Sequence, residues 1–222
     1  MRYYSRVSET FLRARSAAAK EQRRQDLLGS AREQAAARGV RGLTLTSIAD
    51  RAGVHISAVR RYFSSREEIL LVLAAEQWTA FADEVEAILR NGTVDDVAEV
   101  LVNAMLRQPL FCDLLAHAAI DLERAVNGDV VAVYKIAAVD AVERAGMCLE
   151  RSLDALPSGL GREAIADITA LGAVLWQYAN PSPELAALYE RDSRLATAHI
   201  ELAPRLLRAT TALLGGFVAR DR

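Results

Sequence analysis

Residues 44–66 constrain the fold of this chain more than any other stretch. Their sequence, TLTSIADRAGVHISAVRRYFSSR, predicts a short helix over 46–52, a turn at Gly53-Val54 and a second short helix ending near Phe63. Two short helices joined by a glycine-containing turn form a helix-turn-helix, whose second helix fits the major groove of DNA. The stretch therefore predicts double-stranded DNA as a partner.

Several side chains in this stretch support the same local structure. Thr44 is suited to cap the first short helix, and Gly53 stands where the chain needs a positive φ. Val59 and Phe63, four residues apart, would share the buried face of the second helix. The inner face of the first short helix would be apolar: Leu45, Ile48, Ala49 and Ala52. A helical hairpin with no DNA partner would share this pattern, so the charge distribution has to separate the two interpretations.

The charges divide the chain into a basic and an acidic part. The formal net charge is −2, but residues 1–66 hold 14 Lys and Arg against 5 Asp and Glu. Residues 67–222 hold the other 13 Lys and Arg against 24 Asp and Glu. Affinity for duplex DNA rises with each cation that displaces a counterion from the phosphates. The alternative is a solvated basic face without a partner, which the helix-turn-helix inside the same segment disfavours.

Composition predicts an all-α chain. Hydrophobic residues make up 52% of it, Ala and Leu dominate, and strand-like alternation is hard to find. Cys112 and Cys148 form no CxxC pair, which indicates buried thiols in a reducing compartment. The sequence has no membrane-length apolar run and no secretory signal, so we expect a cytoplasmic protein.

The helical pattern indicates three parts. Residues 1–19 form a basic N-terminal arm, expected to be partly disordered, residues 20–66 a DNA-binding domain, and residues 67–222 a helical body. A linking helix over 66–91, which Ser64 or Ser65 would cap, joins the basic part to the acidic part. The remaining predicted helices cover 17–38, 93–108, 110–122, 129–156, 164–179 and 202–218.

Two of these helices indicate a homodimer. Residues 164–179 are apolar or small on nearly every face, and residues 202–218 carry two apolar stripes. Such helices must be covered on all sides, which a four-helix interface between two copies would achieve. The alternative is that both helices pack within the core of one chain. A dimer also matches a helix-turn-helix that reads two half-sites about 34–36 Å apart, or a multiple of that distance.

Residues 27–71 resemble the N-terminal domain of the TetR family of bacterial one-component regulators. The matching positions are Leu27-Leu28, Gly39, Thr44-Leu45, Ile48-Ala49, Ala52-Gly53-Val54, Phe63 and Ser65-Arg66-Glu67. The resemblance implies an N-terminal helix-turn-helix domain followed by a C-terminal ligand-binding and dimerisation domain. It also implies a dimeric repressor that leaves an inverted-repeat operator when a small molecule binds.

The resemblance assigns DNA-binding roles residue by residue. Phosphate contacts would come from Thr44, Thr46 and Arg66, and the recognition helix would present His55, Ile56, Ser57, Arg60, Arg61 and Tyr62. This chain departs from the family at Arg60, where a phosphate-binding Tyr is usual, and at Ile56, where a polar residue or Lys is common. Arg60 can grip a phosphate or bind guanine through two hydrogen bonds, and the sequence leaves both roles open.

The family's small-molecule site lies between the linking helix and the dimer helices. Candidate ligand-binding residues in that region are Trp78, Phe81, Met105, Phe111, His117, Tyr134, Trp176, Gln177 and Tyr178. A pocket for a hydrophobic effector would be mostly apolar with a few polar anchors. Ordinary core packing is the alternative for each apolar member, and His117 also fits a structural histidine.

Other functional classes have less support. The sequence contains no HExxH motif, nucleophile elbow or phosphate-binding glycine loop, and its three histidines are widely separated. We therefore expect no enzyme activity, no cofactor and no metal. Two further alternatives are a helix-turn-helix protein without ligand control and a transcriptional activator.

Overall fold

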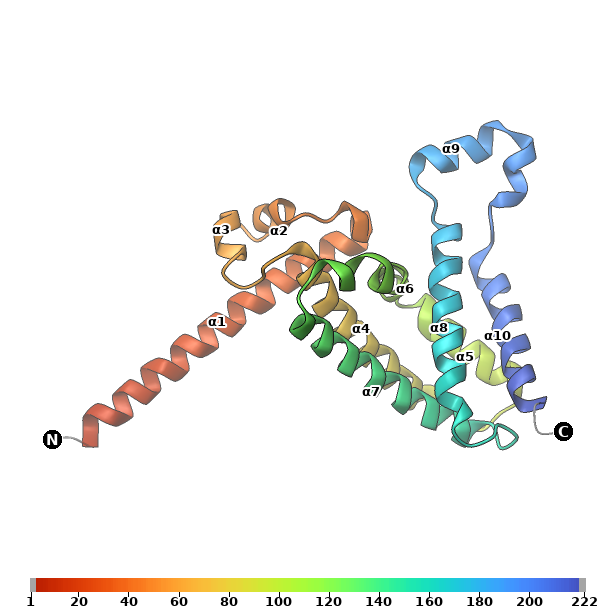
Figure 1. The fold of residues 1–222 in the computed structure, drawn as a ribbon, viewed down its shortest axis with the longest axis horizontal. Helices are drawn as coiled ribbons and strands as arrows, with labels where there is room; N and C mark the ends of the chain where they lie inside the picture. The colour runs from red at the N-terminus through yellow and green to blue at the C-terminus, as the bar shows by residue number, and fades with distance from the viewer. Residues whose placement is uncertain (1–2, 220–222) are drawn as a thin grey trace. The chain divides into compact units, whose positions relative to one another are not determined.

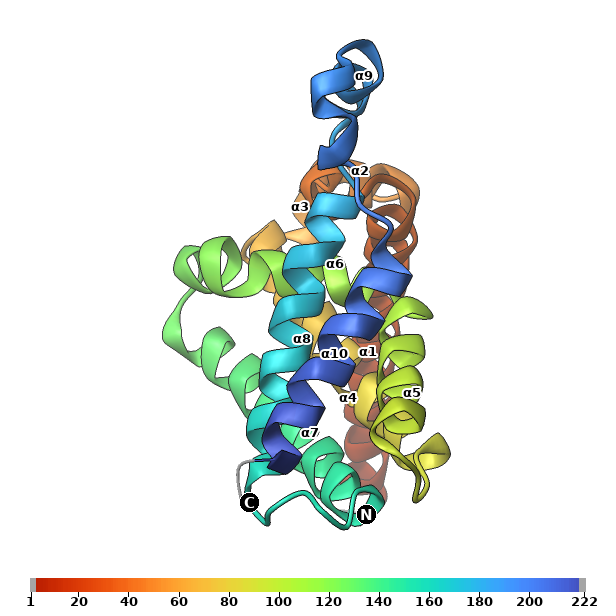
Figure 2. The same cartoon turned by 90° about the vertical axis from the view of Figure 1, so that its right-hand side faces the viewer.

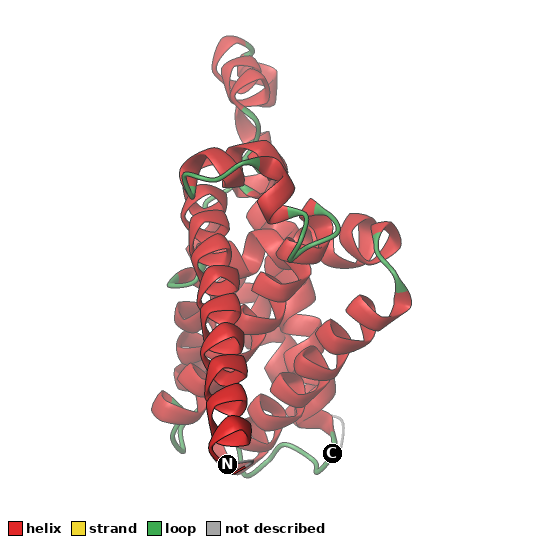
Figure 3. Ribbon diagram, turned by 90° about the vertical axis from the view of Figure 1, so that its left-hand side faces the viewer, coloured by secondary structure: helices red, strands yellow, loops and turns green. Residues whose placement is uncertain are grey.

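The computed structural model describes residues 3–219, with side chains for 17–195 and 197–219. Within this range the chain is helical and contains no β-strand (Figure 3), which confirms the predicted all-α class. The chain divides into two compact units, residues 1–69 and residues 70–222.

The first unit contains α1 (Tyr3–Arg38), α2 (Leu45–Arg51), α3 (Ile56–Val59) and the first turn of α4 (Arg66–Ile88) (Figure 1). Helix α1 begins at Tyr3 rather than near Ala17, so it includes most of the predicted arm 1–19. It ends before Gly39, whose φ of 75° confirms the predicted stop. The core of this unit is formed by Leu27, Leu28, Ala31, Ala35, Ile48, Ala49, Val59 and Phe63.

Thr44 caps helix α2, as predicted, and the helix runs over Leu45–Arg51 rather than 46–52. The Ser47 amide donates to Thr44 Oγ1 at 3.0 Å, and the Thr44 amide donates to Ser47 Oγ at 3.1 Å. These two bonds satisfy backbone donors that the first turn of a helix leaves free. Gly53 ends the turn after α2 with a φ of 66°, as expected.

The second short helix is shorter than predicted, because α3 ends at Val59 and not near Phe63. The amides of Tyr62 and Phe63 both donate to the Val59 carbonyl, at 2.9 and 3.1 Å. This tight turn replaces the regular helical pattern and brings Phe63 into the core, where it is 1% exposed.

The second unit holds the rest of α4 and six further helices (Figures 1 and 2). These are α5 (Val94–Leu106), α6 (Pro109–His117), α7 (Gly128–Ser152), α8 (Leu160–Ala179), α9 (Pro183–Arg191) and α10 (Leu202–Ala219). Helix α8 packs against α6, α7 and α10, and α10 also packs against α5. None of the described helices is both long and apolar enough to cross a membrane.

Some helix ends in this unit differ from the prediction. Helix α4 ends at Ile88 rather than 91, and the Arg90 guanidinium donates to the carbonyls of Ala87 and Leu89 at this end, each at 2.7 Å. Helix α6 ends at His117 and continues as a π-helical turn over Ala118–Leu122. Helix α7 ends at Ser152 rather than near 156.

Helix α9 is not among the predicted helices. The Ser182 hydroxyl accepts from the Leu185 amide at 3.3 Å, and Pro183 occupies the first helical position. None of its residues is buried, and Figures 1 and 2 show it beyond the ends of α8 and α10. Its nine residues are too few to show a clear helical periodicity of apolar residues. The sequence pattern therefore does not distinguish this helix from the loops on either side of it.

Candidate nucleic-acid interface and ligand site

The side chains predicted to bind DNA gather on the first unit, along α2, α3 and the turn after α3. Thr44 and Thr46 are exposed at the start of α2, although Thr44 Oγ1 already accepts from Ser47. The start of a helix presents free amides and a partial positive charge, both of which favour a phosphate.

His55 caps helix α3. Its Nδ1 accepts from the Ser57 amide at 3.3 Å and lies 2.9 Å from Ser57 Oγ. Nδ1 can accept only when it carries no proton, so the neutral ring carries its proton on Nε2. The exposed ring therefore offers an Nε2–H donor beside the exposed Ser57 hydroxyl, and half-buried Ile56 lies between them in the sequence.

Two arginines follow α3 and face solvent. Arg60 and Arg61 are exposed, and neither guanidinium group has a hydrogen-bond or ion-pair partner among the described residues. The backbone of Arg60 is still helical at the end of α3, and Tyr62 is half-buried. The two guanidinium groups are therefore free to bind an external anion.

Arg66 begins α4 and is already partly engaged. Its Nη1 donates to the Leu43 carbonyl at 3.3 Å and its Nε to Glu67 Oε1 at 2.9 Å. The guanidinium is thus fixed in place, with further N–H groups available for a second partner.

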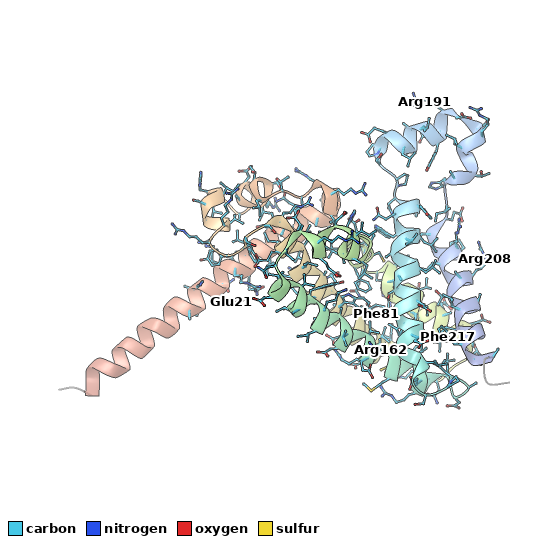
Figure 4. The ribbon with its side chains drawn as sticks, viewed as in Figure 1. Glu21, Phe81, Arg162, Arg191, Arg208 and Phe217 are labelled. Carbon is cyan, nitrogen blue, oxygen red and sulfur yellow. The ribbon has the colours of Figure 1, made fainter. Side chains whose placement is uncertain are left out.

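The aromatic candidates for ligand binding come together in the second unit. Phe111 stacks on Phe81 with 5.0 Å between ring centroids, and the edge of Trp78 meets Phe111 at 4.9 Å. Trp78 Nε1 donates to the Tyr134 hydroxyl at 3.5 Å, and burial raises the pKa of Tyr134. Figure 4 shows Phe81 among the helices of this unit. The cluster links α4, α6 and α7 through buried apolar contact.

Met105 is also buried in this unit, on α5. Its carbonyl accepts from the Cys112 thiol at 3.6 Å, and its side chain lies against Gly172 of α8. Cys112 and Cys148 are free and buried, as predicted, and burial raises the pKa of Cys112 to about 12. This thiol therefore stays protonated and packs as a small apolar group.

The polar ligand candidates Gln177 and His117 both contact Asp113, which is not among the predicted ligand-binding residues. Asp113 Oδ1 accepts from Gln177 Nε2 at 3.0 Å and lies 3.7 Å from His117 Nε2. His117 Nδ1 lies 3.0 Å from Asp121 Oδ2, and the histidine is 5% exposed. Asp113 thus joins α6 to α8 at the point where α6 passes into its π-helical turn.

The other two ligand candidates on α8 differ in how deeply they are buried. Trp176 is half-buried, whereas Tyr178 is 58% exposed and belongs to the outer face of α8. Trp78, Phe81 and Phe111 form ring pairs with one another at the centre of this unit.

Comparison with known proteins decides the family. Residues 27–73 match the family model described as "Bacterial regulatory proteins, tetR family". Residues 75–221 match the model described as "Tetracyclin repressor-like, C-terminal domain". The chain belongs to the TetR family. It is a TetR-family transcriptional regulator, and its helix-turn-helix is the DNA-binding part of that family's architecture.

Individual relatives resemble parts of this TetR-family regulator. HTH-type transcriptional regulators Rv1816 of Mycobacterium tuberculosis and Mb1846 of Mycobacterium bovis are each 38% identical to it over 78 residues. That match covers 35% of this chain and 33% of each relative, so it spans about a third of their length.

Two solved structures share the fold over most of the chain. The fatty acid degradation regulator FadR from Bacillus halodurans aligns with a TM-score of 0.54 and 18% identity, covering 90% of this chain and 97% of that one. A putative TetR-family regulator from Mesorhizobium loti aligns with a TM-score of 0.56 and 13% identity, covering 90% and 96%. At these identities the likeness concerns the fold alone.

Proposed function

We propose that this TetR-family regulator is a dimeric repressor that a small hydrophobic molecule releases from an inverted-repeat operator. The observation that carries the proposal is the stretch 55–61, in which the exposed Arg60 and Arg61 guanidinium groups have no partner among the described residues. It lies in the basic unit, and α4 continues from that unit into a second unit with an aromatic and polar centre.

The proposal gives each DNA-binding candidate a role. His55, Ile56 and Ser57 form the first turn of α3, the part of a recognition helix that contacts base edges. Arg60, Arg61 and Tyr62 follow the helix and contact the flanking backbone or the groove edge. The phosphate contacts near the helix starts belong to Thr44, Thr46 and Arg66.

The exposed apolar face of α8 supports dimerisation through α8 and α10. Helix α8 buries Ile165, Ile168 and Gly172 inside its own unit but leaves Val174 49% exposed. The small residues Ala166 and Ala170 and the ring of Tyr178 are exposed on the same helix. An exposed apolar helix face of this kind is typical of an interface between subunits. The segments 164–179 and 202–218 would form the four-helix interface.

The effector site is proposed at the centre of the second unit. Trp78, Phe81, Met105, Phe111 and Tyr134 would contact the apolar part of the ligand. His117 and Gln177 would bind its polar group, half-buried Trp176 would lie at the edge of the site, and exposed Tyr178 would lie at its outer limit. Trp78 and Phe81 belong to α4, the helix that begins at Arg66. A ligand that displaced these rings would shift α4 and change the spacing of the two recognition helices.

A screen by thermal shift tests this function. The full chain is melted with a panel of hydrophobic small molecules, and each stabilising compound is added to a complex with duplex DNA selected by the wild-type protein from a random pool. We expect at least one compound that stabilises the protein and weakens DNA binding. Phe111→Ala should remove both effects of that compound, while Ile120→Ala, at a position that is 67% exposed, should retain them. If every stabilising compound left DNA affinity unchanged, the protein would bind DNA without ligand control.

A further inference from the structure

A cleft on the first unit lies between α1 and the turn that follows α3. It has a volume of about 400 Å³ and is lined by Ala17, Lys20, Glu21, Arg24, Arg61 and Tyr62. The lining residues on α1 precede the predicted DNA-binding domain or lie at its start. The cleft therefore joins the upstream part of α1 to the turn that follows α3.

Three cations converge on this cleft. Lys20 and Arg24 are four residues apart on α1 and so share one face of the helix. Arg61 approaches from the turn after α3. Like charges held close together repel one another, and a bound anion relieves that repulsion. The arrangement favours a negatively charged ligand.

The cations differ in how firmly they are held. The guanidinium carbon of Arg24 lies 5.3 Å from the ring centroid of buried Phe63, which orients this side chain before any ligand arrives. Lys20 and Arg61 have no ion-pair or hydrogen-bond partner among the side chains that the structure describes. One positioned cation and two free ones can thus close around a single anionic group.

Glu21 is the one carboxylate on the cleft, and it is directed to its own helix. Its Oε1 accepts from Gln25 Nε2 at 2.8 Å and lies 3.6 Å from Arg24 Nη1. Figure 4 marks Glu21 on α1, below α2 and α3 in that view. The carboxylate leaves Lys20 and Arg61 without an internal counter-ion.

We propose that this cleft binds a backbone phosphate of the operator DNA, held by Lys20, Arg24 and Arg61. The Tyr62 hydroxyl supplies a neutral donor of the kind that commonly contacts phosphate. Arg61 and Tyr62 follow directly on α3, so a duplex seated on α3 runs its backbone past the cleft. The inference rests on DNA binding through α3 in the proposed function and extends the contact surface upstream along α1.

The test compares Lys20→Gln with Arg23→Gln. Both remove one positive charge from the same stretch of α1, but Arg23 does not line the cleft and lies 3.8 Å from Asp26. Binding to the duplex selected by the wild-type protein is measured by fluorescence anisotropy over a series of KCl concentrations. Each phosphate contact contributes about 0.9 to the slope of log affinity against log salt. The circular dichroism melt of each variant shows that α1 remains folded.

We expect Lys20→Gln to weaken binding severalfold and to reduce the salt slope by about 0.9. A fourfold increase in salt concentration would then weaken DNA binding by the wild type about 3.5-fold more than it weakens binding by Lys20→Gln. Arg23→Gln should keep the wild-type slope, and Lys20→Arg should restore it. Equal slopes for Lys20→Gln and the wild type would overturn the phosphate site and leave the proposed function intact. A wild-type protein that bound no duplex would overturn both.

A second arm separates DNA phosphate from free phosphate. Inorganic phosphate is titrated into the protein at constant ionic strength, with chloride as the balancing anion, while the melting temperature is followed. We expect phosphate to stabilise the wild type no more than chloride does. A phosphate-specific gain that Lys20→Gln removes, with its DNA salt slope unchanged, would assign the cleft to a free anion instead.

Discussion

Gly146 of α7 and Gly161 of α8 are in backbone contact, and neither position has room for a side chain. A Cβ atom on Gly146 would lie 2.7 Å from the amide nitrogen of Arg162 and 2.9 Å from the carbonyl carbon of Gly161. Backbone atoms cannot rotate away as a side chain can, so α7 and α8 would have to separate. This contact fixes how closely one of the proposed dimer helices approaches the rest of its unit.

Gly146→Ala should therefore destabilise the second unit by about 1–3 kcal/mol. Gly172→Ala is the matched control on α8, because its Cβ would meet the flexible end of the Met105 side chain rather than backbone. We expect Gly172→Ala to stay within about 1 kcal/mol of the wild type, since Ala also favours the helix. Chemical denaturation of both variants checks this order, and equal losses would show that the helix crossing tolerates a side chain.

Arg144 gives the second unit a pH-dependent contribution. It binds Glu86 and Asp83 on α4, with 3.0 Å from Nε to Glu86 Oε1 and 2.6 Å from Nη2 to Asp83 Oδ1. The hydrogen bonds from Arg144 hold the pKa of Glu86 below its usual value of 4.5. A lowered folded-state pKa stabilises the fold above the unfolded value, and this stabilisation is lost as the pH falls through the folded value.

Arg144→Met should therefore lower stability by up to about 1 kcal/mol at neutral pH, since the Arg144 and Glu86 side chains are about a third exposed and that of Asp83 is 60% exposed. The difference from the wild type should shrink below pH 4.5 as Glu86 gains its proton. Arg162→Met is the control, because its ion pair with Glu143 is 4.0 Å long and both side chains are more than half exposed. A difference between Arg144→Met and wild type that persisted unchanged at low pH would contradict this assignment.

The dimer proposal predicts that Val174→Arg separates the subunits. Val174 is 49% exposed on the outer face of α8, and a buried unpaired charge costs several kcal/mol. We expect the dimer Kd to rise by about 100-fold or more, measured by analytical ultracentrifugation. Val133→Arg on α7, where Val133 is 66% exposed, should leave the association unchanged. If both variants behaved alike, α8 would not form the interface.

The structure also favours one of the two roles that the sequence leaves open for Arg60. Helix α3 ends at Val59, so Arg60 lies past the turn whose leading residues meet base edges. We therefore expect a phosphate contact. Arg60→Ala should weaken binding to all sequences by a similar factor and reduce the salt slope by about 0.9. Relaxed specificity at one base pair, with an unchanged slope, would instead mark base readout.

Local signals made much of the fold predictable. Thr44 and Ser65 cap the helices predicted to begin after them, and Gly53 adopts the expected positive φ. These features depend on residues three or four apart, which a sequence displays directly. The end of α3 was not predictable in this way, because a buried Phe63 draws the chain into a tight turn.

The contacts that the sequence could not predict join residues far apart in the chain. Asp113 holds Gln177 at a separation of 64 positions, so its place between two ligand candidates depends on how α6 packs against α8. Lys20 and Arg61 line one cleft only because α1 passes beside the turn after α3. The basic composition of residues 1–66 indicated a DNA-binding surface, but tertiary packing decides which of those cations act together.

Selection from a pool of random duplexes, followed by measurement of the number of chains bound, tests whether the protein reads an operator as a dimer. We expect the wild-type protein to enrich an inverted repeat whose half-sites are about 34–36 Å apart, or a multiple of that distance. We also expect two chains on each repeat, one recognition helix for each half-site. Enrichment of a single half-site bound by one chain, or no enrichment at all, would contradict dimeric operator binding.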